Sequence, residues 1–182
     1  RVLCAALADL AGVLADEAQD LERALTLYQE AIALAHAQQR PVMAGNMVAG
    51  TGLALLALGR TDEATAALEQ ALQLQRASQA LVASGWTLQF MGMLAHEQGQ
   101  DHRAVELCHE SLALTLPAGS LNIVPLSFES LAGVAARWGQ PVLAARLLGA
   151  AEALRERIQV RLPPLERPAY ERTLAAVGAQ LS

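Results

Sequence analysis

The sequence predicts an all-α fold: a right-handed α-solenoid of four helical hairpins followed by a capping helix. The first observation is composition, since 38 Ala and 33 Leu occupy 71 of 182 positions, and both are strong helix formers. Only 3% of residues are aromatic, which argues against a β-sandwich or barrel. At 53% hydrophobic and 17% charged, the chain is also too apolar for a disordered one.

The second observation is a repeat of 40 residues, seen most clearly at Ala24, Ala64, Ala104 and Ala144. Twelve residues before these alanines stand Gly12, Gly52, Gly92 and Ala132. Four residues after them stand Tyr28, Leu68, Cys108 and Leu148, and seven after them Ala31, Ala71, Ser111 and Ala151. Small residues let two helices approach to about 8–10 Å, so Gly52 is expected to face Ala64.

Each copy reads as two helices, because apolar residues recur at i, i+3, i+4 and i+7. The first helices are expected at 2–17, 42–58, 82–98 and 122–138, and the second at 21–37, 61–77, 101–115 and 141–157. These make hairpins of about 2–37, 42–77, 82–115 and 122–157 within residues 1–161. Residues 162–182 read as a Pro-containing linker and a capping helix that closes the solenoid, with one apolar face formed by Tyr170, Leu174, Val177 and Leu181.

The residues between helices suit their ends. The left-handed residue that ends a helix is expected at Gly59, Gly99 and Gly139. N-caps are expected at Asp20, Thr61 and Asp101. Pro141 is expected at a first helical position, where its missing N–H costs nothing.

Charge and cysteine content exclude several classes of protein. The net charge is −5 without a single Lys, and it is uneven: residues 1–136 carry 6 Arg and 14 acids, residues 137–182 carry 7 Arg and 4 acids. This does not favour nucleic-acid binding, which needs a dense basic face. The basic C-terminal part is expected to form exposed ion pairs of little energy with Glu152 and Glu156 along one helix; its arginines are Arg137, Arg146, Arg155, Arg157 and Arg161. Cys4 and Cys108 read as free thiols of a reducing cytoplasm.

No membrane span is expected, because the longest apolar stretch, Met47 to Leu58, is shorter than the roughly twenty residues a span needs. The sequence starts at Arg1 inside a helical pattern, so we interpret it as a fragment of a longer protein whose native N-terminus is not in view.

The pattern Gly12, Ala24, Tyr28 and Ala31 resembles the tetratricopeptide repeat, and Gly52, Ala64, Leu68 and Ala71 nearly match it. The usual period is 34; a period of 40 is typical of the tetratricopeptide tails of large bacterial regulators. The run 144–155, with Leu162-Pro163-Pro164 and residues 166–171, resembles the C-terminal segment of bacterial signal-transduction ATPases, including LuxR-type and MalT-like transcriptional regulators. Their nucleotide- and DNA-binding signatures do not occur in these residues, so those activities are not carried over.

We find no catalytic or metal motif. His96-Glu97 lacks a second His four residues on, where Gln100 stands. Cys108 takes the register of core residues and points about 100° away from His109 on a helix. Without Lys there is no phosphate-binding Walker lysine. The sequence therefore predicts no enzyme, no metal site and no cofactor.

The resemblance implies instead a groove on the concave side, lined by the first helix of each hairpin. Its candidate binding residues are Asn46, Leu53, Trp86, Gln89, Met93, His96 and Glu129. The same carry-over adds Asp9, Val13, Asp16, Ala49, Leu56, Glu97, Leu126 and Arg137. Trp86 with nearby amides suits a peptide or sugar anchor; the alternative is that Trp86 packs on its hairpin with Phe90 one turn later.

Two functions stay open. The first is a cytoplasmic, non-enzymatic sensing or docking module of a signal-transduction ATPase-type regulator, whose groove binds a small-molecule inducer, a protein or peptide segment, or other domains of its own chain. The second is an interaction scaffold without a small ligand, for which a homodimer is an open alternative; the apolar residues Ala49, Leu53 and Leu56 could bury a partner helix.

Overall fold

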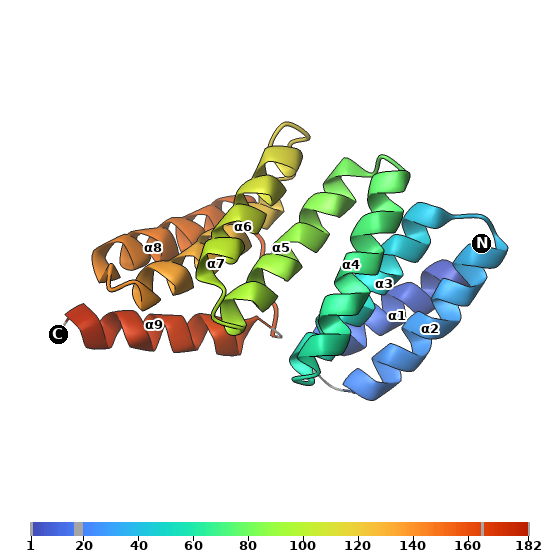
Figure 1. Cartoon of the computed structure of the whole chain (residues 1–182), viewed down its shortest axis with the longest axis horizontal. Helices are drawn as coiled ribbons and strands as arrows, with labels where there is room; N and C mark the ends of the chain where they lie inside the picture. The colour runs from blue at the N-terminus through green and yellow to red at the C-terminus, as the bar shows by residue number, and fades with distance from the viewer. Residues whose placement is uncertain (1, 17–19, 165, 182) are drawn as a thin grey trace.

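The computed structural model describes residues 2–16, 20–164 and 166–181. Its regular structure is helical, with no strand in these ranges. The chain runs from α1 and α2 at the right of Figure 1 to α8 and α9 at the left. The elements are α1 (Val2–Asp16), α2 (Leu21–Ala37), α3 (Pro41–Ala57), α4 (Thr61–Ala77), α5 (Leu81–Glu97), α6 (Asp101–Thr115), η1 (Leu121–Ile123), α7 (Val124–Arg137), α8 (Pro141–Ile158) and α9 (Arg167–Leu181).

The helices pack in chain order, as a repeat-like all-α fold requires. α1 packs on α2, α3 on α4, α5 on α6 and α7 on α8, and each pair packs on the next through its second helix. First helices of neighbouring pairs also touch, as α3 does with α5 and α5 with α7. The second helices begin at the predicted residues: Leu21, Thr61, Asp101 and Pro141.

One first helix begins differently from the prediction. The segment expected to be helical from residue 122 opens as the 3-10 turn η1, and α7 itself begins at Val124. Pro125 stands in the first turn of α7. This position tolerates proline, because the N–H that proline lacks would have no partner there.

The expected helix ends are partly right. Gly59, Gly99 and Gly139 have φ of 73°, 78° and 68°, which confirms the left-handed residues. Asp20 is a true N-cap, because its carboxylate accepts a 2.9 Å hydrogen bond from the Arg23 N–H.

The other two N-cap predictions are wrong. Thr61 and Asp101 are the first helical residues, and the N-caps before them are Arg60 and Gln100, neither of which makes a side-chain cap bond. The carboxylate of Asp101 instead binds His96. Each N-cap directly follows the left-handed glycine, so the helix starts at the residue that side-chain preference selects as the cap, one residue earlier than that preference implies.

The helices approach through glycines. A Cβ at Gly52 would lie 2.7 Å from Leu68 Cγ and 3.4 Å from the Ala64 carbonyl oxygen, which confirms that Gly52 faces Ala64. A Cβ at Gly85 would overlap the Thr115 methyl group, with the Ser111 carbonyl 3.2 Å away. Neighbouring backbones this close leave no space for a side chain.

The terminal helix α9 packs on α7 and α8. Val177 is 3% exposed and shares a cluster with Ala132, Leu148 and Tyr170. The predicted apolar face is wrong in part, because Leu174 and Leu181 are 50% and 51% exposed. The inner stripe runs instead through Tyr170, Val177 and the polar Thr173 and Gln180, which are spaced by three or four residues.

Candidate binding groove

The described structure contains a groove of about 740 Å³. One side is formed by the first helices α3, α5 and α7, and the other by α9 and the linker before it. Four of the predicted binding residues line this groove: Leu53, Met93, His96 and Glu129. Of the wider carried-over set, Leu56, Glu97, Leu126 and Arg137 line it too.

Trp86 lies beside the groove rather than in it. It lines a smaller chamber of about 230 Å³, together with Phe90, Arg155 and Arg161. The ring centroids of Trp86 and Phe90 are 6.1 Å apart and tilted by 46°, so the two rings pack on each other as the alternative prediction has it. The chamber shares Leu53, Leu126 and Glu166 with the groove, and Trp86 is therefore placed to report on what the groove contains.

Gln89 is not a groove residue, and this corrects the sequence prediction. Its side chain is 0% exposed between α5 and α7. Its amide nitrogen donates to Ser130 Oγ at 2.8 Å, and its amide oxygen accepts from Ser127 Oγ at 2.7 Å. Both ends of the amide are satisfied by α7, so Gln89 joins the third and fourth hairpins.

Asn46 is exposed and does not line the groove. Its side-chain oxygen accepts a 3.1 Å hydrogen bond from Gln75 Nε2. The buried Gln75 amide in turn accepts from the Thr87 hydroxyl at 2.8 Å. These hydrogen bonds link α3, α4 and α5, and Asn46 is the exposed end of this structural network.

The other four residues of the wider carried-over set are not among those that line the groove. Asp9 and Val13 of the first hairpin are on α1, away from the residues that line the groove. Ala49 is buried within the helix packing. The side chain of Asp16 lies outside the described residues.

One rim of the groove is a charged cluster of His96, Asp101 and Arg137. Asp101, whose side chain is 8% exposed, lies 2.8 Å from His96 Nδ1 and 3.1 Å from Arg137 Nη1. The same Arg137 nitrogen donates to the His96 carbonyl at 2.9 Å. The cluster joins the C-terminal end of α5 to that of α7, which fixes the imidazole at the groove edge.

A second ion pair crosses the groove from α9. Arg172 Nη2 lies 2.7 Å from Glu97 Oε1 of α5, and both side chains are well exposed. The pair connects the terminal helix to the third hairpin.

Glu129 stands on the floor of the groove and pairs with Arg155 of α8. The two side chains are 8% and 11% exposed, so Arg155 does not form the exposed pairs expected with Glu152 and Glu156. Burial raises the pKa of the Glu129 carboxyl, and the hydrogen bond from Arg155 acts in the opposite direction. Arg155 on α8 therefore supplies the counter-charge for a Glu129 carboxylate that has lost most of its contact with water.

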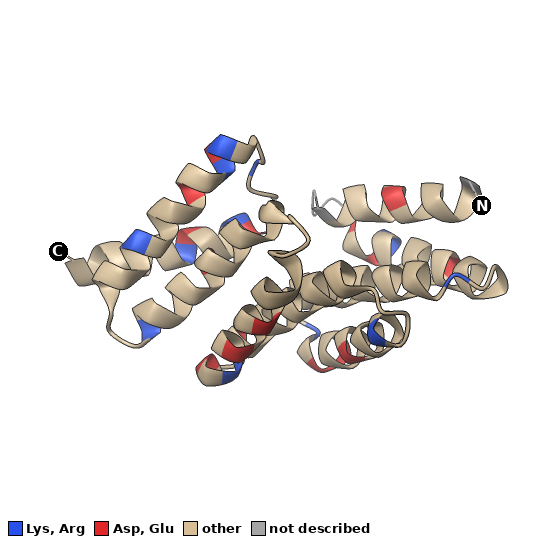
Figure 2. Ribbon diagram, turned by 90° about the horizontal axis from the view of Figure 1, so that it is seen from above, with Lys and Arg blue, Asp and Glu red and all other residues tan. Residues whose placement is uncertain are grey.

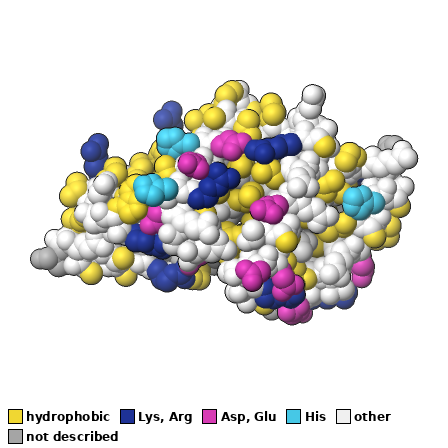
Figure 3. All heavy atoms as spheres, in the orientation of Figure 1, with side chains coloured by type: hydrophobic (Ala, Val, Ile, Leu, Met, Phe, Trp, Pro, Cys, Tyr) yellow, Lys and Arg dark blue, Asp and Glu magenta, His cyan; other side chains and the backbone are white. Residues whose placement is uncertain are grey.

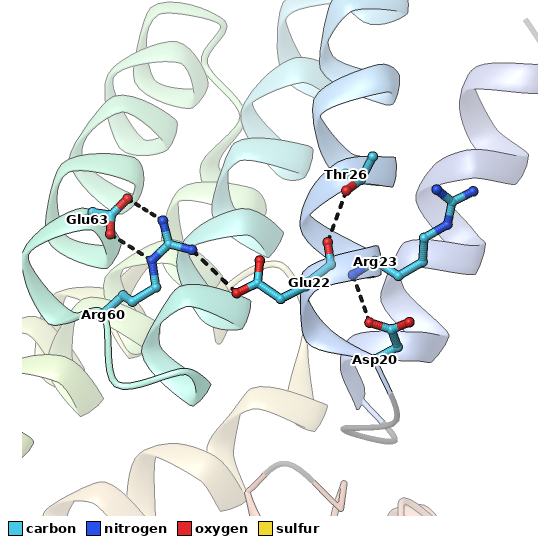
Figure 4. Close-up of polar contacts among 6 residues, drawn as sticks. All are labelled: Asp20, Glu22, Arg23, Thr26, Arg60 and Glu63. Atoms are coloured by element: carbon cyan, nitrogen blue, oxygen red, sulfur yellow. Dashed lines mark hydrogen bonds and ion pairs between the residues drawn. The ribbon is translucent and has the colours of Figure 1, made fainter.

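The opposite end of the groove is fixed by surface ion pairs. Leu21, Gly59 and Thr61 line this end. Arg60 makes a bidentate contact with Glu63 at 2.6–2.7 Å and approaches Glu22 at 3.8 Å. Figure 4 shows Arg60 reaching between them, so the start of α2 is connected to the turn before α4.

The wall formed by α9 was missed by the sequence reasoning. Tyr170, Arg172 and Thr173 line the groove from this helix, as do Pro164 and Glu166 from the linker. The one available signal was the apolar spacing from Tyr170 to Val177, which predicts an inner face but not which hairpins it faces. These residues lie outside the 40-residue register, so the repeat could not place them.

The described residues that line the groove carry charges of both signs. On the face in Figure 3, acidic and basic side chains lie beside each other among apolar ones. The arginines concentrate on the C-terminal helices in Figure 2, as the sequence has it. Within the described residues there is no cluster of three His, Cys, Asp or Glu side chains that could hold a metal. No helix described is both long and apolar enough to cross a bilayer.

Comparison with known proteins identifies no family for this chain. No protein-family model matches the chain, and no curated protein matches it.

Proposed function

We propose that this chain is a non-enzymatic sensing or docking module that binds its partner in the groove between α3, α5, α7 and α9. The observation that carries the proposal is the groove itself. Its volume of about 740 Å³ lies in the range of about 300–1,000 Å³ typical of small-molecule sites. Its lining combines apolar side chains with polar groups such as His96, Glu129 and Tyr170, and such a combination gives a site both affinity and orientation.

The architecture behind the proposal is a right-handed tetratricopeptide-like solenoid of four hairpins with a period of 40 residues. The resemblance of residues 144–171 supports a cytoplasmic transcriptional regulator of the signal-transduction ATPase type. In such a protein the ligand acts by binding one state of the whole chain more tightly than the other. The consecutive packing of α1 to α9 is in keeping with this architecture.

A thermal-shift screen tests the proposal, with sugars, amino acids, nucleotides, small apolar molecules and short peptides as ligand classes. A ligand at a hundred times its Kd stabilises the folded state by about 2.7 kcal/mol. At roughly 2–4 °C per kcal/mol, this raises Tm by about 5–11 °C.

Two neighbouring exposed alanines of α9 provide a matched pair of variants. Ala176 lines the groove, whereas Ala175 does not. We expect Ala176→Phe to abolish a ligand-induced shift and Ala175→Phe to preserve it. A shift that survives both variants would place the ligand elsewhere, and no shift from any class would contradict a sensing function.

The second candidate, a scaffold without a small ligand, is favoured by one observation. The first helix α1 exposes Leu3, Leu10 and Val13 at 61%, 50% and 52%, and contiguous apolar exposure is typical of an interaction face. Light scattering that gives a concentration-independent monomer would argue against self-association through this face.

A further inference from the structure

We infer that the ligand of the groove is an uncharged small molecule with a compact apolar body and one hydrogen-bonding group. This inference rests on the proposed function and names the ligand class of that same site.

The first argument is that the charges along the groove are already paired. Arg137 faces Asp101 and Arg172 faces Glu97. Glu129 faces Arg155 on the floor. Glu166 at the linker edge has an interaction of its own.

A charged ligand would therefore lose its water without gaining a free counter-charge. Leaving an ion desolvated and unpaired is far more costly than burying a neutral polar group. An anion is the least suited, because the lining carboxylates Glu97, Glu129 and Glu166 outnumber the lining arginines Arg137 and Arg172.

The second argument is the shape and chemistry of the walls. Leu53, Leu56 and Met93 provide apolar surface from α3 and α5. Ala136, Ala169 and Ala176 complete it from α7 and α9 with small side chains that leave room for a ligand, whereas the His96 imidazole covers Gly133. Because the linker and α9 bound the groove, a compact body fits it better than a long extended peptide.

The third argument is a hydroxyl that is left to the ligand. Tyr170 lines the groove from α9 and is half-buried. Its hydroxyl makes no hydrogen bond to the residues that the structure describes. Burial, with Glu152 and Glu129 nearby, raises the pKa of Tyr170, so at neutral pH the phenol is protonated and can donate a hydrogen bond. By contrast, the Ser130 hydroxyl already bonds Gln89 and the Leu126 carbonyl.

The test uses three rigid molecules that differ in one group: 1-adamantanol, adamantane-1-carboxylate and 1-adamantylammonium. Each is titrated into the 182-residue chain by calorimetry at neutral pH. In parallel, Trp138→Phe leaves Trp86 as the single tryptophan, whose emission reports on the adjoining chamber. We expect the alcohol to bind at least tenfold more tightly than either ion and to shift the Trp86 emission.

The variants locate the site. We expect Ala176→Phe to weaken binding of the alcohol at least tenfold and Ala175→Phe to change it less than twofold. Tyr170→Phe should weaken the binding of 1-adamantanol severalfold without abolishing it, because the apolar walls still contact its hydrocarbon cage.

Two results would overturn the inference. If the carboxylate or the ammonium binds as tightly as the alcohol, the groove selects a charged ligand, and the proposed binding function still stands. If the alcohol does not bind, or binds equally well to Ala176→Phe, the inference fails; the wider thermal-shift screen then decides separately whether the groove binds anything.

Discussion

The clearest test of the packing concerns Gln89, which joins the third and fourth hairpins. We expect Gln89→Leu to destabilise the protein by about 2 kcal/mol without acting on ligand contacts. The substitution removes two short hydrogen bonds, 2.8 Å to Ser130 and 2.7 Å from Ser127. A side-chain hydrogen bond contributes about 0.5–1.5 kcal/mol net.

The serines limit the size of the effect. Ser127 Oγ also lies 3.2 Å from the Ile123 carbonyl, and Ser130 Oγ lies 3.0 Å from the Leu126 carbonyl. Both hydroxyls therefore keep a partner within α7 after Gln89→Leu. Since no donor is left buried without a partner, the loss stays near the sum of two net hydrogen bonds and does not include a further desolvation penalty.

Urea denaturation followed by circular dichroism measures the change, and the corresponding fall in Tm is roughly 4–8 °C. Gln73→Leu is the matched control, because Gln73 is an exposed residue of α4. In the Gln89→Leu background, alanine at both Ser127 and Ser130 should cost less than the same double substitution costs in the unaltered protein, since the bonds to their shared partner are already gone. If Gln89→Leu is as stable as Gln73→Leu but loses ligand, then Gln89 contacts the ligand and the structural interpretation is refuted.

Three further predictions concern the interior. Arg155→Met should cost about 3–5 kcal/mol of stability at pH 7, because it leaves the Glu129 carboxylate buried and unpaired. Burial raises the pKa of Glu129 in the folded state, so the cost of ionising this carboxyl appears only as pH rises above its pKa in the unfolded chain. The loss of stability should therefore shrink at pH 4–5, and a pH-independent loss in urea titrations would contradict this. Gly85→Ala should lower the free energy of unfolding by about 1–3 kcal/mol, because the new methyl group overpacks the helix contact. Gly149→Ala has no atom within 4 Å of the new Cβ and should raise it by up to about 1 kcal/mol. Equal changes in Tm for the two variants would contradict this packing. Burial raises the pKa of Cys108 to about 11, so Ellman's reagent at pH 8 should react with this thiol only after denaturation, and prompt native labelling would argue against a closed core.

The fold could be predicted because small residues mark where helices meet. Gly52 and Ala64 recur by register and touch in the structure. The turns after α3, α5 and α7 were equally visible, since Gly59, Gly99 and Gly139 stand there with positive φ. The turns after α2, α4 and α8 were not: Gln39, Gln79 and Gln159 have φ of 53°, 54° and 57°, and glutamine carries no preference that would predict this.

The site was predicted less well, because register fixes a helix face but not what covers it. Gln89 and Glu129 are 40 residues apart and take equivalent places on α5 and α7. Yet α7 buries Gln89 completely, while Glu129 meets the groove and Arg155. Trp86 and Asn46 likewise share a register, and one lines a chamber whereas the other is exposed.

The groove combines a repeated wall with one that the repeat does not encode. The repeated helices contribute mainly apolar residues, such as Leu53 and Met93, which would accept many ligands. The distinctive groups, including the Tyr170 hydroxyl, come from α9. Selectivity therefore depends on a helix that is loosely attached: Val177 is its buried residue in the described part, and its link to α5 is an exposed ion pair, which contributes little. A ligand that touches both walls would stabilise α9 by mass action, so binding and the position of this helix are coupled.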